Sequence, residues 1–329
     1  MQITIEQARG FLNEITSENK VAIIHHDDTD GFVSGVLLYD FCRKKGANVG
    51  HFCFSNGGDQ DKMIKKIKNS DVVLIADFGP SSVSKILEFA KDKKVLYIDH
   101  HKKDVEIPPE INEYRTKSEV SASKSVWQIA GGKVWLEIVC ELADAGYTNV
   151  ENKIKIDAFA RERKISPDEV KEKFYFRIDY FLAYFFENYD EAFEILDSVG
   201  NYNGLDNLDK YANVVKKEID KFVNELECEK KKLGDVWYYY FEPYYPIKSI
   251  VTTDISFKYP DDVFVFAMPF GNVIGISARC QSGKVDCAEF LKKAVKEFEG
   301  ANAGGHFKAA GGQVLKKDLE KFKERLREI

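Results

Sequence analysis

The sequence predicts an α/β protein: an N-terminal domain with a parallel sheet and helices on both of its faces, a helical connector, and a smaller C-terminal α/β domain. Two observations support this prediction. Short runs of β-branched and aliphatic residues alternate with amphipathic segments of roughly 10 to 15 residues, which is typical of βαβ units. The early runs are apolar throughout, as expected of parallel strands that are buried on both faces.

Four strands are predicted in the first part of the chain, each preceded by a predicted helix. The strands span residues 21–24, 49–54, 72–76 and 95–98, and the helices span residues 5–19, 32–45, 59–68 and 81–93. Because βαβ crossovers are almost always right-handed, such strands join one parallel sheet. The second strand ends in Ser-Asn-Gly-Gly, a loop signal, whereas the other three end in carboxylates or histidines.

The middle of the chain is predicted to be helical, and strands return in the last third. Helices are expected at 121–129, 135–143 and 208–232, the aromatic residues of 152–188 are interpreted as packed core, and 201–207 is expected to be a loop. Later strands are expected at 237–241, 263–267 and 273–277, with helices at 289–297 and 319–327. The predicted domains are 1–185, a helical connector 186–233, and 234–329.

Composition narrows the class of protein. The 329 residues suffice for two domains. The six cysteines are scattered without zinc-site pairing, which indicates reduced thiols. No apolar run of about 18 residues and no secretory signal is visible, so we expect a cytoplasmic protein that does not cross a membrane. The net charge of -6 provides no global attraction to polyanions.

Polar side chains gather where the predicted strands end. They are His26, Asp28, Asp30, Asp77, Asp99, His100 and His101, with Asp144 after a helix. Ligands of open parallel sheets bind beyond the carboxyl ends of the strands. Carboxylates and imidazoles without thiolates suit Mn²⁺ or Mg²⁺. Asp28 and Asp30 alternate and can face two neighbouring sites, and a shared Asp77 could bridge two ions ~3.5–4 Å apart.

Four motifs in this order resemble the DHH phosphoesterase superfamily, which includes RecJ-type exonucleases, oligoribonucleases and cyclic-dinucleotide phosphodiesterases. They are His26-x-Asp28-x-Asp30-Gly31, Asp77 after a buried strand, Asp99-His100-His101, and a C-terminal pair of segments. In that pair, Ser277-Ala-Arg279 resembles the substrate-gripping strand of the DHH-associated domain, and 303–306 with 309–311 resembles its glycine-histidine loop. Residues 152–232 match no motif. The resemblance implies that 1–185 is the catalytic domain and 234–329 the substrate-binding domain.

The resemblance also implies roles for individual residues. One metal would be held by Asp28, Asp77 and His26, and the other by Asp30, Asp77, His100 and Asp144, with Asp104 or Asp157 as alternatives to Asp144. Asp99 would orient His100 or a neighbour. Successive side chains alternate in an extended segment, so His100 on the metal would leave His101 to donate to the substrate.

The C-terminal motifs would bind the substrate. Ser277, Arg279 and His306 would hold its phosphate and its end, with bidentate contacts from the arginine. Gly304 and Gly305 would let the backbone approach closely.

The implied function is a phosphodiesterase with two Mn²⁺ ions per chain, or Mg²⁺ or Co²⁺ in their place. It would hydrolyse single-stranded DNA or RNA, or short oligonucleotides, with a metal-activated water. The acidic charge balance favours short or single-stranded substrates. The alternatives are a cyclic-dinucleotide phosphodiesterase or small nucleotide phosphatase, and a non-catalytic replication scaffold, which should have lost ligands that this chain retains. Partners consistent with the resemblance are a second copy in a homodimer or a replication or repair protein.

Overall fold

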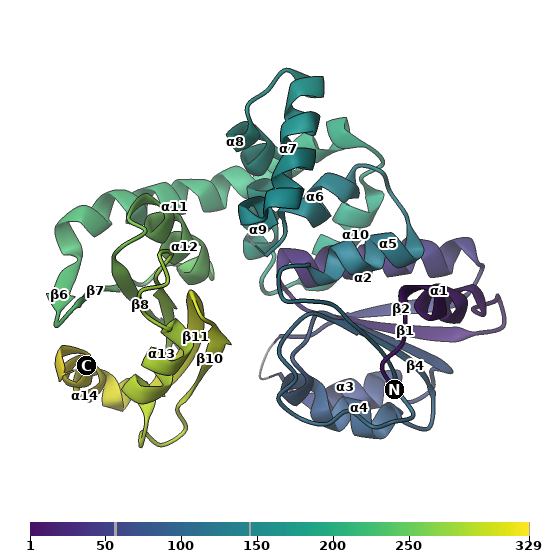
Figure 1. Cartoon of the computed structure of the whole chain (residues 1–329), viewed down its shortest axis with the longest axis horizontal. Coiled ribbons are helices and arrows are strands. Elements are labelled where there is room, and N and C mark those ends of the chain that lie inside the picture. Colours follow the sequence, from purple (N-terminus) through teal and green to yellow (C-terminus); the bar gives the residue numbers. More distant parts are fainter. Residues whose placement is uncertain (56–57, 145, 329) are drawn as a thin grey trace. The chain divides into compact units, whose positions relative to one another are not determined.

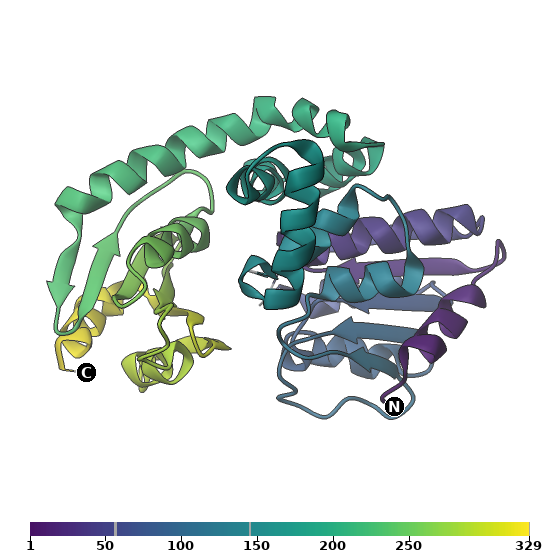
Figure 2. The same cartoon turned by 45° about the horizontal axis from the view of Figure 1, so that its top comes forward.

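A computed structural model describes residues 1–55, 58–144 and 146–328. The chain divides into two compact units, residues 1–212 and 213–329, and each is described by itself. Helix α11 (Asp209–Glu229) contains the boundary and is one uninterrupted helix (Figure 2). Among the described helices, none combines the length and the apolar composition that crossing a bilayer requires.

Within the described residues, the first unit contains an all-parallel sheet of five strands in the order β2-β1-β3-β4-β5. The strands are β1 (Lys20–His25), β2 (Asn48–Cys53), β3 (Val72–Ala76), β4 (Lys94–Asp99) and β5 (Asn112–Arg115). Every residue of β3 is buried, as the apolar run predicts. The predicted parallel sheet is therefore confirmed.

Helices cover both faces of this sheet. They are α1 (Ile5–Asn13), α2 (Thr29–Lys44), α3 (Gln60–Ile67), α4 (Ser84–Ala90) and α5 (Ala122–Ala130). Helices α3 and α4 lie on one face, where Met63 and Leu87 join a core with Ile75 and Tyr97 (Figure 1). Helices α1, α2 and α5 lie on the other face (Figure 1).

The remaining helices of the unit form a further layer beside α2 and α5. They are α6 (Leu136–Leu142), α7 (Val150–Arg163), α8 (Pro167–Val170), α9 (Arg177–Tyr184) and α10 (Tyr189–Ser198), with a π-helical segment at Lys171–Phe176. Phe174 and Phe181 are buried, so aromatic residues of 152–188 do pack as core.

Two local predictions in this unit were wrong, and one strand was not predicted. The first helix ends at Asn13, because the Thr16 N–H donates to Asn19 Oδ1 at 2.9 Å and forms a turn there instead. The loop expected at 201–207 is a 3₁₀ helix, Tyr202–Leu208. The N–H groups of its first turn donate to the side chain of Asn201. Strand β5 was missed since Asn-Glu-Tyr-Arg carries no apolar run, and pairing with β4 determines its conformation.

Within the described residues, the second unit is built on a sheet of six strands in the order β10-β11-β9-β8-β7-β6. The strands are β6 (Lys231–Leu233), β7 (Val236–Tyr240), β8 (Val263–Phe270), β9 (Val273–Arg279), β10 (Asn302–His306) and β11 (Ala309–Leu315). The pair β7–β8 is parallel and the other pairs are antiparallel. A smaller C-terminal α/β domain was predicted, and this prediction is confirmed.

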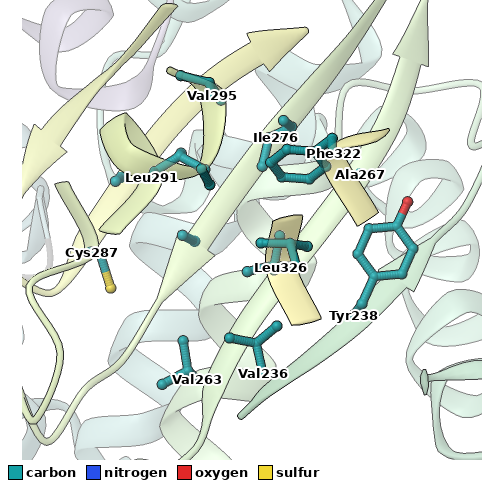
Figure 3. Close-up of a cluster of buried hydrophobic side chains, with 14 of the residues drawn as sticks. Val236, Tyr238, Val263, Ala267, Ile276, Cys287, Leu291, Val295, Phe322 and Leu326 are labelled. Carbon is teal, nitrogen blue, oxygen red and sulfur yellow. The ribbon is translucent and has the colours of Figure 1, made fainter. Parts of the chain in front are cut away.

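Helices also cover this second sheet. They are α12 (Lys248–Lys258), α13 (Cys287–Val295) and α14 (Leu319–Glu328). Leu291 of α13 and Phe322 of α14 pack among strand residues such as Val236 and Ile276 in one apolar core (Figure 3). Helix α12 was not predicted, and it contacts β8 and β9.

The expected glycine-histidine loop is also corrected. Residues 302–306 are the edge strand β10, which pairs antiparallel with β11 so that Gly304 lies opposite Gly311. The resemblance implied a loop, but pairing with β11 makes this segment a strand.

Candidate functional site

The carboxyl ends of β1, β3 and β4 bring the predicted polar residues together. Donor atoms within 4.8 Å of one another form three overlapping groups among the described residues. The groups are His26, Asp28 and Asp77; Asp30, Asp77, His100 and Asp144; and Asp77, His100 and His101. Asp77 belongs to all three groups, so the clusters share one carboxylate.

Asp77 follows β3 in a left-handed backbone conformation, with φ +67°. Its N–H donates to the carbonyl of Ile98 at 3.0 Å, which ties this turn to β4. The side chain is 1% exposed, and neither carboxylate oxygen has a hydrogen-bond partner in the described part of the chain. Burial and the charges of Asp28 and Asp30 raise the pKa of Asp77 well above its usual range. The ionised form of such a buried carboxylate is stable only with a positive charge beside it.

His100 presents one ring nitrogen to this cluster. Its Nδ1 lies 3.2 Å from the carbonyl of Ser118 and donates to it, so Nε2 faces Asp144 Oδ2 at 2.9 Å and Asp77 Oδ1 at 3.4 Å. Burial lowers the pKa of His100, but the carboxylates of Asp144 and Asp77 outweigh it and raise this pKa to about 12. A backbone carbonyl that fixes the tautomer is the usual arrangement of a metal-binding histidine.

Asp30 is held by the N-terminus of α5. Its Oδ2 accepts from the Ala122 N–H at 2.7 Å, and its Oδ1 accepts from the Ser123 N–H at 2.8 Å and from the Ser123 hydroxyl. These are N–H groups that a helix leaves unpaired in its first turn. Burial and the charge of Asp144 nevertheless raise the pKa of Asp30 to about 6. Sequence reasoning missed Ser123, although a Ser-x-Ser helix start was visible.

His26 and Asp28 form the other side of the cluster. Asp28 caps α2, where its Oδ1 accepts from the Gly31 N–H at 3.0 Å, and its Oδ2 lies 2.9 Å from His26 Nδ1. Asp28 and Asp30 therefore reach different groups, but from a helix cap and a first helical turn rather than from an alternating extended segment. Burial lowers the pKa of His26, and Asp28 raises it to about 10 overall.

The structure also places the alternatives to Asp144. Asp144 follows α6 with φ +51°. Asp104 instead accepts from the N–H and hydroxyl of Ser81, and Asp157 is exposed on α7. Of the three, Asp144 is the one that lies in a donor group.

Asp99 orients His101, not His100. Its Oδ1 lies 2.8 Å from His101 Nδ1, and its Oδ2 accepts from Arg115 Nη1 at 2.6 Å and from the Tyr97 hydroxyl at 3.0 Å. His101 Nδ1 also lies 3.8 Å from Asp77 Oδ1, so the two histidines do not strictly alternate. Both rings approach Asp77 because β4 ends at Asp99. Arg115 was missed together with β5.

The predicted substrate residues lie in the second unit. On β9, Arg279 Nη1 donates to Ser277 Oγ at 3.0 Å and to the carbonyl of Ala310 at 3.2 Å. Gly304, Gly305 and His306 are exposed on β10. Gly305 has φ +136°, and a Cβ there would lie 2.5 Å from the carbonyl oxygen of Ala309, so this position requires glycine. A Cβ at Gly304 would meet nothing within 4 Å.

Comparison with known proteins identifies the family. The profile of the DHH family, N-terminal domain, matches residues 20–158, and that of the DHHA1 domain matches residues 246–329. The chain belongs to the DHH phosphoesterase superfamily. Members of this superfamily are hydrolytic phosphoesterases. A search of curated protein sequences finds no match.

Solved structures share the fold. RecJ from Thermus thermophilus in complex with Mn²⁺ has a TM-score of 0.72 at 16% identity, over 98% of this chain and 54% of that one. This chain thus spans about half the length of that RecJ. An exonuclease RecJ bound to manganese has a TM-score of 0.70 at 16% identity, over 98% and 93%. An exopolyphosphatase-related protein from Bacteroides fragilis has a TM-score of 0.61 at 15% identity, over 98% and 95%.

Proposed function

We propose that this chain is a divalent-metal-dependent phosphodiesterase of the exonuclease type, which hydrolyses single-stranded DNA or RNA or short oligonucleotides. The observation that supports this most is Asp77, which belongs to all three groups of ligand atoms and whose two buried oxygens lack hydrogen-bond partners in the described residues. Manganese accompanies RecJ in two structures of this fold.

The residues fit a pair of hard or borderline cations. Every candidate donor is a carboxylate oxygen or an imidazole nitrogen, which Mn²⁺ and Mg²⁺ accept. His26, Asp28 and Asp77 would hold one ion, and Asp30, Asp77, His100 and Asp144 the other. Bound there, the ions would activate a water and neutralise charge on the phosphoryl oxygens.

His101 would act on the substrate itself. Its Nδ1 lies 2.8 Å from Asp99 Oδ1, and its Nε2 would donate to a phosphoryl or leaving oxygen of the substrate. Asp99 fixes the ring in this orientation, and Arg115 fixes Asp99. Such a preorganised donor stabilises charge that develops in the transition state.

In the second unit, Ser277, Arg279 and His306 would bind the phosphate and the end of the strand. The Arg279 guanidinium is already placed by Ser277 Oγ and by Thr253 Oγ1, which accepts from its Nε at 3.3 Å. A guanidinium carries five N–H donors in one plane, which suits the several oxygens of a phosphate.

End-labelled single strands of several lengths, incubated with Mn²⁺, test this proposal. We expect a ladder of products in which the strands are shortened from one end. We also expect faster turnover of oligonucleotides than of cyclic dinucleotides. Preference for a cyclic dinucleotide or a mononucleotide would favour the alternative phosphodiesterase or phosphatase. Bound metal without hydrolysis of any phosphoester would indicate a non-catalytic replication scaffold. Light scattering in the same buffer shows whether a homodimer forms.

A further inference from the structure

Helix α12 covers the face of β9 that carries Ser277 and Arg279. The opposite face of that strand, with Ile274, Ile276 and Ala278, belongs to the apolar core. Two hydrogen bonds join α12 to this strand. Arg279 Nε donates to Thr253 Oγ1 at 3.3 Å, and Lys248 Nζ donates to the carbonyl of Ile276 at 2.9 Å.

Among the residues that join α12 to β9, Lys248 has an unusual environment. One of its three N–H donors is used by the carbonyl of Ile276, and no carboxylate oxygen of the described residues lies within 4.0 Å of its ammonium. Burial and the nearby Arg279 lower the pKa of Lys248 to about 8. By contrast, Lys258 at the other end of α12 pairs with Asp254 at 2.9 Å. A shielded ammonium without a counter-charge favours an anionic ligand.

Space beside this ammonium depends on Gly275. A Cβ at that position would lie 3.2 Å from Lys248 Nζ, closer than most real Cβ contacts. Ser277 Oγ accepts from Arg279, and the residue before it, Ile276, accepts from Lys248. The two cations therefore flank one short stretch of β9.

We infer that Lys248 is a second cation of the Arg279 phosphate site and contacts a phosphoryl group of the bound nucleotide. This inference rests on the proposed function, because it assigns a further binding residue to the same substrate. One cation on β9 and one on α12, both beside the same stretch of the strand, suit a phosphoryl group, whose several oxygens accept from both at once.

The test is a set of lysine-to-methionine variants that keep the length and apolar stem of the side chain. Binding of the dinucleotide pdTdT is measured by calorimetry with Ca²⁺, and its hydrolysis with Mn²⁺. Removing one charge-assisted hydrogen bond should weaken binding ~10–100-fold in Lys248→Met. The control Lys258→Met, on the same helix, should bind as the unaltered protein does.

A double-mutant cycle tests whether Lys248 and Arg279 bind the same phosphoryl group. If Lys248 and Arg279 bind the same group, the variant with both Lys248→Met and Arg279→Met should lose less affinity than the two single losses combined. Additive losses, or unchanged binding in Lys248→Met, would overturn the inference. Failure of the unaltered protein to hydrolyse pdTdT would instead count against the proposed function.

A second variant covers the case in which Lys248→Met does not fold. Gly275→Ala retains the lysine and crowds its ammonium, so we expect a smaller loss of pdTdT affinity, of a few fold, with an unchanged thermal transition. Unchanged affinity in a folded Gly275→Ala protein, when Lys248→Met does not fold, would contradict the inference.

Discussion

The two candidate regions of this chain carry opposite charge, and their functional side chains are held in place by different contacts. In the first unit, Asp28, Asp30 and Asp144 lie around Asp77. Burial and the charges of these carboxylates raise the pKa of Asp77, whereas the carboxylates of Asp144 and Asp77 raise the pKa of His100 against the effect of burial. In the second unit, Lys248 and Arg279 donate to hydroxyl and carbonyl oxygens on β9 and α12. The first region is built to receive cations, and the second to receive an anion.

The difference extends to what holds each side chain. Asp28 caps α2, Asp30 accepts from the start of α5, and Asp77 sits in a turn tied to β4. These are backbone contacts at the ends of strands and helices, so the cluster is fixed by the fold itself. In the second region, long charged side chains reach between α12 and β9: Lys248 donates to the carbonyl of Ile276, and Arg279 donates to Thr253 Oγ1. We therefore expect substitutions in the first region to change metal content and those in the second to change substrate affinity.

The largest effect is expected from Asp77→Asn. Asp77 lies in every donor group, so losing its charge should remove both metal sites and lower turnover ~10⁴-fold or more, as loss of a central catalytic group does. Elemental analysis after gel filtration should find two divalent ions per chain in the unaltered protein and fewer than one in the variant. The control Asp104→Asn, at a carboxylate that binds Ser81, should retain both ions. Two ions in Asp77→Asn, or one tightly held zinc in the unaltered protein, would refute the two-metal site.

The next effect separates the adjacent histidines. His101→Ala should keep both ions and lose ~10²–10³-fold in single-turnover rate, by analogy with loss of an oxyanion-hole donor. His100→Ala should lose one ion outright, because its Nε2 faces Asp77 and Asp144. Metal content and single-turnover rates of the two variants decide between these roles. Swapped phenotypes would reverse the assignment, and near-normal rates in both would refute the site.

The sequence allowed prediction of the parts of this site that are local in the chain. An apolar run that breaks into Asp77, or into Asp99-His100-His101, marks both a buried strand and its functional end. The partners that hold these residues lie far away in sequence. Asp30 and Ser123 are separated by 93 positions, and no local pattern signals their contact.

Tertiary pairing also explains what was missed in the second unit. The family resemblance implied a loop at Gly304 and Gly305, and pairing with the strand β11 makes their segment a strand. Helix α12 carries polar residues such as Lys248 and Thr252 where an apolar stripe would be expected for packing on a sheet. Its amphipathic pattern is consequently weak, and the sequence did not predict it.

A smaller effect, on binding, tests the second region. Arg279→Ala and His306→Ala should leave both ions in place and weaken pdTdT binding ~10–100-fold, which is typical when a charged hydrogen-bonding group is lost. Calorimetry and elemental analysis on the same preparations provide both measurements. Loss of metal in either variant would mean that the division of roles between the two units is wrong.

The smallest effect is expected at Arg115, which acts through Asp99 on His101. Arg115 Nη1 donates to Asp99 Oδ2, and its Nε donates to Glu113, so Arg115→Met should loosen the carboxylate that orients the histidine. Loss of such an outer-shell contact costs ~10–100-fold, and we expect the low end, because the Tyr97 hydroxyl still donates to Asp99. Metal content should not change.

A double variant separates this positioning role from a general loss of structure. If Arg115 acts only by orienting His101, Arg115→Met should slow single turnover when His101 is present. It should have no further effect when it is combined with His101→Ala. An equal loss in both backgrounds would mean that Arg115 supports the edge strand β5 rather than the orientation of His101.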